Sequence, residues 1–77
     1  MVFEIKLYSL FKEHSPNGKT SFNIEVPEST SVASVLEMLN LNEKIDKIIL
    51  LNGRPVKLDT FLGNGDLLVV LPVAEGG

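Results

Sequence analysis

Leu67-Leu68-Val69-Val70-Leu71 is the stretch that decides the fold, because it is continuously apolar and rich in β-forming residues. This pattern is typical of a strand in the middle of a sheet. Pro72 follows the run and has no N–H to offer a neighbouring strand, so we expect the strand to end there. A chain of 77 residues has room for one domain, and this strand is its expected centre.

The N-terminal part of the chain predicts two strands joined by a long loop. Residues 2–11 and 20–26 alternate between apolar and polar side chains, whereas turn-forming residues fill positions 12–19. Pro27 ends the second alternating segment. The side chains expected on the inner face are Phe3, Ile5, Leu7, Phe22, Ile24 and Val26.

One short amphipathic helix is predicted after these strands. Ser31 is an N-cap candidate. Apolar residues then recur at the i, i+3, i+4, i+7 spacing of one helical face, at Val32, Val35, Leu36 and Leu39. The helix is expected to stop near residues 40–42, where two asparagines can adopt the left-handed conformation.

A third strand and a tight turn are predicted after a charged linker at residues 43–47. Ile48-Ile49-Leu50-Leu51 is apolar on both faces and too short for a separate helix, so it is typical of a covered strand. Asn52-Gly53 is typical of a tight hairpin turn. Residues 54–58 are expected to form a short edge strand, where Pro55 is tolerated.

The order strand, strand, helix, strand, short strand, strand predicts an α+β fold. The first and last strands lie side by side and parallel in this prediction, and the helix crosses one face of the sheet. The result is a β-grasp (ubiquitin-like) roll with a mixed sheet of four to five strands. We expect residues 1–72 to form this domain and residues 73–77 to leave it as a flexible arm.

Composition argues against several classes of function. Seven basic and ten acidic residues give a net charge of −3, which argues against nucleic acid and favours partners with a basic docking surface. The absence of cysteine removes disulfides and thiolate metal sites, and no metal site is expected. No apolar stretch is long enough to cross a bilayer, and the N-terminus lacks the pattern of a secretory signal, so we expect a cytoplasmic protein without membrane contact. A walled active site would compete with the core for residues, so a self-contained enzyme is not expected.

The last three residues are the most informative for function. Gly76 and Gly77 carry no Cβ, so another backbone or a nucleotide can approach them closely, as in a narrow enzyme pocket. Glu75 precedes them. The alternative interpretation is a frayed chain end without a function.

Four motifs, in their order along the chain, resemble those of the ThiS/MoaD sulfur carriers. They are Asn52-Gly53-Arg54-Pro55-Val56, Leu62-Gly63-Asn64-Gly65-Asp66, Leu71-Pro72-Val73 and the terminal Gly76-Gly77. The order of elements resembles this family over nearly the whole chain. Departures occur at Val73 and Ala74, where the family often has a second proline or another small residue, and at Glu75, which adds a charge.

The resemblance implies that the carboxylate of Gly77 is the reacting group. An E1-like activating enzyme uses ATP and Mg²⁺ to adenylate it, and sulfur then replaces AMP to give a thiocarboxylate. Gly76 supplies clearance, and Glu75 extends the reach of the arm. The carrier binds no cofactor of its own. Its second partner is either the large subunit of molybdopterin synthase or thiazole synthase, and Leu71-Pro72-Val73 favours the molybdopterin branch.

Four further side chains are predicted to contact a partner. Leu71 and Val73 flank the point where the arm leaves the sheet, and Arg54 is expected either to pair with acidic groups of an activating enzyme or to be a solvated turn charge. Phe61 is either a docking group or, together with Leu62, a small core plug.

The other singled-out residues are predicted to have no direct functional contact. His14 is interpreted as a solvated loop residue, because a metal site needs several convergent ligands. Asn52, Gly53, Gly65 and Asp66 are expected to serve the turns that set strand register.

Three functions from different classes remain open. A molybdopterin-type or thiamine-type sulfur carrier leads. A ubiquitin-like modifier, whose C-terminal glycine forms an isopeptide bond to lysines, shares the adenylation step and differs in the acceptor. The third is a β-grasp interaction module with an idle tail.

Overall fold

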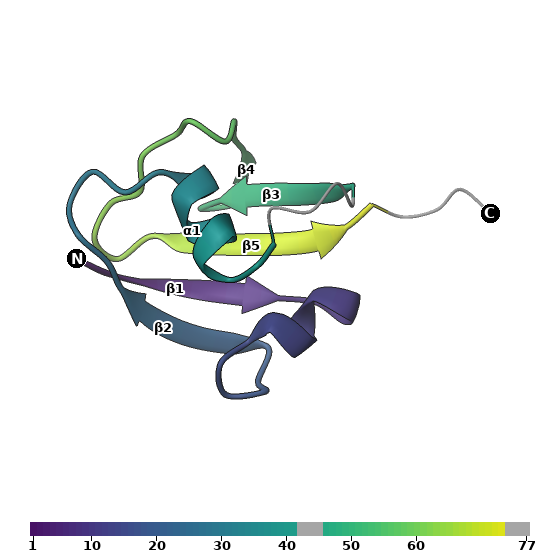
Figure 1. The fold of residues 1–77 in the computed structure, drawn as a ribbon. Helices are drawn as coiled ribbons and strands as arrows, with labels where there is room; N and C mark the ends of the chain where they lie inside the picture. Colours follow the sequence, from purple (N-terminus) through teal and green to yellow (C-terminus); the bar gives the residue numbers. More distant parts are fainter. Residues whose placement is uncertain (42–45, 74–77) are drawn as a thin grey trace.

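The structure is a computed structural model that describes residues 1–41 and 46–73. It contains a mixed five-stranded sheet with the strand order β2-β1-β5-β3-β4 (Figure 1). The strands are β1 (Val2–Leu7), β2 (Ser21–Glu25), β3 (Lys47–Leu51), β4 (Arg54–Pro55) and β5 (Leu67–Pro72). The helices are the 3-10 helix η1 (Ser9–His14) and the α-helix α1 (Val32–Met38).

Strand β5 is the central strand, as its apolar sequence predicts. It pairs parallel with β1, with Ile5 opposite Leu68, and antiparallel with β3, with Ile49 opposite Val70. The hairpins β1–β2 and β3–β4 are antiparallel. The predicted α+β, β-grasp arrangement is therefore confirmed.

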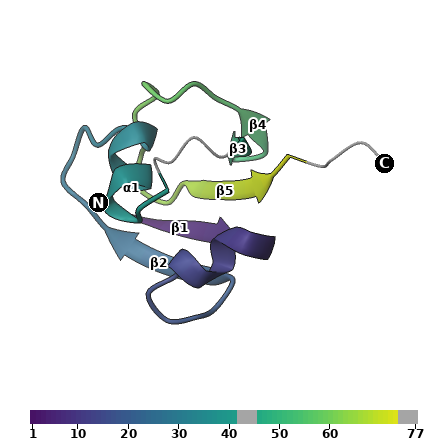
Figure 2. The same cartoon turned by 45° about the vertical axis from the view of Figure 1, so that its right-hand side comes forward.

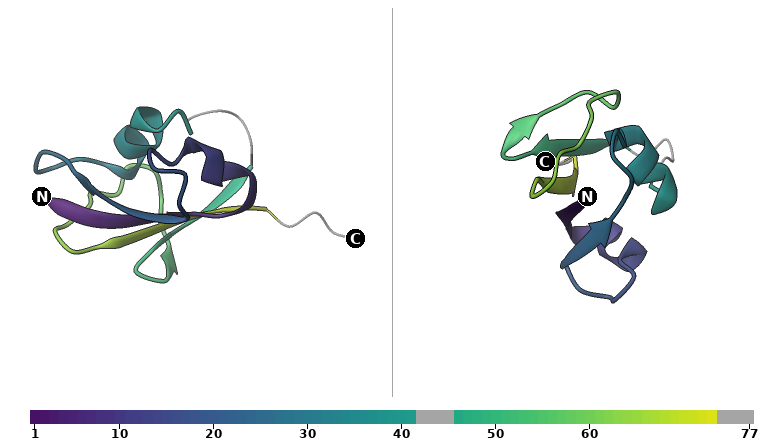
Figure 3. Two further views of the ribbon diagram at one scale, coloured as in Figure 1. Left: turned by 90° about the horizontal axis from the view of Figure 1, so that it is seen from below. Right: turned by 90° about the vertical axis from the view of Figure 1, so that its left-hand side faces the viewer.

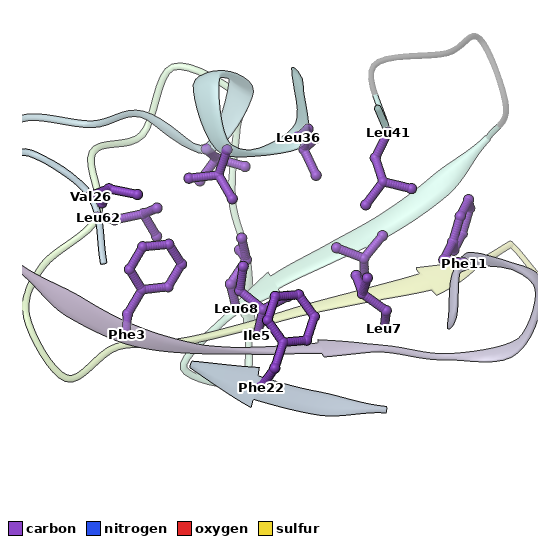
Figure 4. Packing of buried hydrophobic residues seen from close by; sticks show 13 residues of the cluster. Phe3, Ile5, Leu7, Phe11, Phe22, Val26, Leu36, Leu41, Leu62 and Leu68 are labelled. Carbon is purple, nitrogen blue, oxygen red and sulfur yellow. The ribbon is translucent and has the colours of Figure 1, made fainter. Parts of the chain in front are cut away.

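Both helices lie on one side of the sheet (Figure 3). The core fills the space between them and the sheet (Figure 4). Its buried apolar residues are Phe3, Ile5, Leu7, Phe11, Phe22, Val26, Val32, Val35, Leu36, Leu41, Leu62, Leu68 and Val70. In β1 and β5 the fully buried positions alternate with less buried ones, because successive side chains of a strand point to opposite faces.

Strand β1 is shorter than the alternation predicts. It ends at Leu7, and the expected strand and loop residues that follow form η1 instead. Ser9 has φ 57°, a left-handed conformation that breaks the strand. The turn of helix then directs Phe11 into the core, where its side chain is fully buried. The strand therefore ends at Leu7, but Phe11 still contributes its aromatic side chain to the core.

Helix α1 begins as the sequence predicts and ends at Met38, before the predicted stop at residues 40–42. The Ser31 side chain accepts a hydrogen bond from the Ser34 N–H at 3.2 Å, which confirms the N-cap. The helix stops at Met38, and Asn40 has φ 59°, the left-handed conformation typical of a helix end. Asn42 lies outside the described residues, as do most residues of the predicted linker.

The β3–β4 hairpin confirms the Asn-Gly turn and corrects two other expectations. Asn52 and Gly53 have φ of 53° and 85°, the two positive values that a type I′ turn needs. Strand β4 contains only Arg54–Pro55, so the predicted edge strand over residues 54–58 is too long. Cover on both faces of β3 is also wrong, because Ile48 is 40% exposed.

The segment that follows β4 arches away from the sheet and returns to the start of β5 (Figure 2). Its backbone also contacts the start of α1, since Val32 N–H and Ala33 N–H donate to the carbonyls of Thr60 and Leu58, both at 2.9 Å. These bonds satisfy N–H groups at the start of a helix that have no partner within it. The long connection is therefore attached to α1 near its middle.

Candidate functional site

The end of β5 is the part of the fold that leads to the C-terminal residues. Leu71 and Pro72 are half-buried in the sheet, and Val73 is 46% exposed just beyond it. Gly77, Gly76 and Glu75 lie outside the described residues, so their predicted roles stay predictions. The predicted boundary between the domain (residues 1–72) and the arm (residues 73–77) also stays a prediction, because most of the arm lies outside the described residues.

An apolar stripe runs along the face of the sheet opposite the helices, which we call the open face. It reaches the end of β5, where the chain leaves the sheet, and we call this the exit point. We define the stripe as Ile48, Leu50, Leu67, Val69 and Leu71. Register places these side chains together, because Ile48 pairs with Leu71 and Leu50 pairs with Val69, and paired residues point to the same face. The opposite face of β5 carries the buried Leu68 and Val70. Among residues 1–41 and 46–73, both helices lie on that opposite side, so no helix covers the stripe (Figure 3). Ile48 is 40% exposed, and the other four residues are half-buried.

Polar side chains border the stripe on the β1 side. Lys6 pairs with Val69, and Glu4 pairs with Leu67, so both share the open face. Ser21 donates a hydrogen bond to the Glu4 carboxylate, which holds that side chain over the β1–β2 pair. The open face is thus an apolar strip with a charged rim, the composition found at protein interfaces.

Sequence reasoning predicted Leu71 as a contact residue and missed the rest of the stripe. The run Ile48–Leu51 was interpreted as covered, although a single predicted helix can cover only one face of the sheet. The prediction of a single helix was therefore the signal in the sequence that the other face of the sheet has no helix over it.

A hydrogen-bond network fixes the other end of β5. Asn52 donates its N–H to the Leu67 carbonyl at 2.8 Å and accepts the Leu67 N–H on Oδ1 at 2.9 Å. Its amide Nδ2 donates to Asp66 Oδ1 at 3.0 Å, while Asp66 Oδ2 accepts the Gly63 N–H at 2.6 Å. Two of the motifs that carry the family resemblance therefore meet at one junction.

Asn64 and Gly65 extend this junction to β1. Asn64 Oδ1 accepts the Val2 N–H at 2.8 Å, and the Gly65 N–H donates to the Val2 carbonyl at 2.8 Å. Gly65 has φ 84°, which favours glycine. The glycines, asparagines and aspartate of these motifs hold strand register, as the sequence predicts, and set where β5 begins.

Replacing Asp66 by alanine is expected to lower the free energy of unfolding by about 1–3 kcal/mol, because two donors lose a carboxylate acceptor. Urea unfolding measures the change. Asp59→Ala is the matched control, since Asp59 is an exposed acid in the same connection. Equal effects of the two substitutions would show that the network contributes no stability.

Phe61 and Arg54 lie apart from the stripe. Phe61 is 65% exposed and forms an isolated β-bridge with Ser31, near the start of α1. Leu62 is buried, so the core-plug interpretation is confirmed for Leu62 and wrong for Phe61. Arg54 pairs with Leu51 on the edge strand β4 and is exposed. The structure brings Leu71 and Val73 together but does not bring Phe61 or Arg54 to them.

His14 is not the solvated loop residue that the sequence predicts. It ends η1, is half-buried, and its Nδ1 lies 2.9 Å from the Leu39 carbonyl oxygen. This contact joins η1 to the end of α1. In the part of the chain that the structure describes, no group of three or more His, Cys, Asp or Glu side chains could hold a metal ion. The described helices are also all too short or too polar to span a bilayer.

Comparison with known proteins gives a family and several fold relatives. A model of the ThiS family matches residues 8–77. No curated protein matches the sequence. A Pyrococcus furiosus protein described as a candidate molybdopterin converting factor, subunit 1, is 25% identical, with a TM-score of 0.77 over 95% of this chain and 99% of that chain.

Two other solved structures share the fold at lower identity. SAMP1 from Haloferax volcanii is 22% identical, with a TM-score of 0.80 over 100% of both chains. A chain in the complex of subunits 1 and 2 of the molybdopterin-converting factor from Helicobacter pylori is 24% identical, with a TM-score of 0.69 over 100% of both chains. These likenesses show that the ubiquitin-like β-grasp fold is shared.

Proposed function

Because this chain belongs to the ThiS family, we propose that it is a sulfur carrier and that the carboxylate of Gly77 is its reacting group. The observation that carries the proposal is the placement of β5. This strand is paired on both sides in the middle of the sheet. It therefore fixes where the chain leaves the sheet after Pro72, beside Leu71 of the apolar stripe.

The proposed chemistry needs activation, because a carboxylate is anionic and resists nucleophilic attack. A Gly77 carboxylate oxygen attacks the α-phosphorus of ATP, and pyrophosphate leaves. A sulfur nucleophile of the hydrosulfide class then adds to the acyl carbon, and AMP leaves to give the thiocarboxylate. In this proposal the adenylating groups, ATP and Mg²⁺ belong to the activating enzyme, and the carrier is its co-substrate rather than an enzyme.

The second partner is proposed to be the large subunit of molybdopterin synthase. Fold relatives support this branch, since one is described as a candidate molybdopterin converting factor, subunit 1, and another comes from a complex of subunits 1 and 2 of the molybdopterin-converting factor. The family match is the observation in favour of a thiamine-type carrier, whose partner would be thiazole synthase. Incubating the thiocarboxylated chain with each purified synthase and its substrate distinguishes the branches by which product forms.

A protein modifier is the second candidate, favoured by the fold shared with a Haloferax volcanii protein that is described as small archaeal modifier protein 1. Intact-mass analysis after incubation with ATP, Mg²⁺, a candidate activating enzyme and a sulfur source separates the two functions. A mass gain equal to one sulfur-for-oxygen exchange, located at Gly77 by fragmentation, supports the carrier. High-molecular-weight conjugates that survive reduction, without that mass gain, support the modifier.

The apolar stripe is proposed to be the surface that docks on the activating enzyme. It is continuous with the start of the arm, and binding energy at interfaces concentrates in apolar groups that become fully desolvated. Val73 extends this surface beyond Pro72. Arg54 and Phe61, which lie elsewhere on the molecule, are proposed as secondary contacts.

Ile48→Lys is expected to weaken binding to the activating enzyme about tenfold or more, because it places a charge next to Leu71, at the end of the stripe where β5 ends. The melting temperature should change little, since Ile48 is 40% exposed. Met38→Lys is the matched control, because Met38 is 55% exposed on α1, on the other side of the sheet. Titration calorimetry measures both affinities. Weaker binding by the control alone would place the docking surface on the helical side.

A further inference from the structure

Strand β2 is an edge strand whose outer backbone groups have no partner strand within residues 1–41 and 46–73. The Leu7 N–H donates to the Thr20 carbonyl and the Val26 N–H donates to the Met1 carbonyl, both at 2.9 Å. Alternate residues of an antiparallel pair form the ladder bonds. These two contacts therefore show that the backbone N–H and C=O groups of Phe22 and Ile24 point toward β1. The N–H and C=O groups of Ser21, Asn23 and Glu25 point outward.

The two edges of the sheet differ in how they are protected. At the β4 edge the strand has two residues, and one of them is Pro55, which has no N–H. Strand β2 has five residues, pairs with β1 in an unbroken register, and contains no proline, glycine or lysine. Asn23 and Glu25 are exposed. An edge of this kind is a template for pairing with another strand.

We propose that β2 pairs antiparallel with β2 of a second copy of this chain, about a two-fold axis at Asn23. In this register Asn23 lies opposite Asn23 of the second copy, and Ser21 lies opposite Glu25. All of the outward backbone groups of the strand then find partners, because each directly opposed pair exchanges two N–H···O bonds. The two sheets become one continuous sheet.

The side chains fit this register. On the open face Ser21, whose hydroxyl donates to Glu4 of its own chain, lies opposite Glu25 of the second copy, and the two Asn23 amides can donate to each other. On the core face Phe22 lies opposite Ile24, an aromatic–β-branched pair. No two like charges stand directly opposite each other within the strand. This self-complementarity is the reason for naming a second copy, rather than an unrelated peptide, as the occupant.

Registers shifted by two residues form fewer backbone hydrogen bonds between the two β2 strands. A shift by two residues in one direction brings Ser21 opposite Pro27, which has no N–H to donate. The shift in the other direction brings Glu25 opposite Lys19, whose N–H already donates to Asn17 Oδ1 at 2.9 Å. The register centred on Asn23 is therefore the favoured one.

The paired chains would present their C-terminal ends in opposite directions. Strand β5 is parallel to β1 and hence antiparallel to β2. Antiparallel pairing of the two β2 strands makes the two β5 strands antiparallel as well. Each copy would keep its own apolar stripe and its own exit point, so the proposal is independent of the sulfur-carrier function.

Sedimentation equilibrium of the full chain at increasing concentration tests the proposal. We expect a reversible monomer–dimer equilibrium. Asn23→Lys should raise the dissociation constant about tenfold, because it removes the amide pair and places two like charges opposite each other. Leu58→Lys is the matched control, since it adds the same charge at an exposed position in the connection between β4 and β5, and should leave the constant unchanged.

Amide hydrogen exchange locates the contact. The N–H groups of Ser21, Asn23 and Glu25 should exchange more slowly as the concentration rises, in wild type but not in Asn23→Lys. A chain that stays monomeric at millimolar concentration would overturn the proposal. So would a dimer in which these three amides gain no protection, because its interface would lie elsewhere.

Discussion

Deleting Gly76 and Gly77 is expected to abolish sulfur loading while leaving the melting temperature unchanged. The new terminal carboxylate would belong to Glu75 and would be withdrawn by about 7 Å, the reach of two extended residues. An adenylating site built around a narrow channel would no longer meet it. Intact-mass analysis after incubation with ATP, Mg²⁺, the activating enzyme and a sulfur source would then show no sulfur-for-oxygen exchange.

The fold should survive this deletion because the core described for residues 1–41 and 46–73 is built without the last residues. The buried apolar side chains lie between Phe3 and Val70, and β5 ends at Pro72. Thermal unfolding followed by circular dichroism checks this half of the prediction. A large drop in melting temperature would mean that the diglycine segment belongs to the folded domain.

Gly77→Ala tests whether sulfur loading depends only on the length of the chain or also on the absence of a side chain at its last residue. This variant keeps the carboxylate at full chain length and adds only a Cβ. Folding should be almost intact and sulfur loading impaired, though less than in the deletion. Wild-type loading by Gly77→Ala would show that the enzyme pocket tolerates a side chain and that length alone matters.

Leu68→Ala is expected to lower the free energy of unfolding by about 2–5 kcal/mol, because it removes a fully buried side chain and leaves a cavity. Leu68 is 0% exposed and lies opposite Ile5 in the central strand. A domain of this size has a total stability of roughly 5–15 kcal/mol. The variant should therefore unfold at much lower urea concentration than wild type.

Leu67→Ala is the matched control on the same strand. Leu67 is half-buried and points to the open face, so its truncation should cost about 1 kcal/mol or less. Its effect should appear in binding to the activating enzyme, where it removes part of the stripe. Comparable stability losses in both variants would contradict the assignment of buried and open faces on β5.

Strong local signals made most elements predictable. The continuous apolar run placed β5 at the sheet centre, the Ser31 cap fixed the start of α1, and Asn52-Gly53 fixed the hairpin. In each case the hydrophobic pattern and the turn or cap chemistry agree. Agreement between such independent signals is what makes a sequence specify one structure.

Features that depend on tertiary contacts were not predictable. Alternation continued into the residues that form η1, and only the backbone conformation of Ser9 shows where β1 stops. The apolar run Ile48–Leu51 does not indicate which face of its strand is covered. The contact of His14 with Leu39 joins residues 25 positions apart in the chain, and no local pattern encodes it.

For the candidate site, the sequence indicated the residues but not their arrangement. Asn52 and Asp66 were predicted to serve separate turns, yet their side chains bond directly. Phe61 was assigned to the same group as Leu71, and the structure separates them. The roles of Glu75, Gly76 and Gly77 rest on the family match and on the proposed chemistry.

The parallel pairing of β1 with β5 has a practical consequence for experiments. Parallel strands carry their starts at one end of the sheet and their ends at the other, so Met1 and Val73 lie at opposite ends of the molecule (Figure 1). A fusion tag or surface linker attached through Met1 would keep an N–H on that nitrogen, so its bond to the Val26 carbonyl could persist. Immobilising the chain by its amino terminus would thus leave the end of β5 remote from the support for capture of binding proteins, whereas a carboxyl-terminal tag would occupy the proposed reacting group.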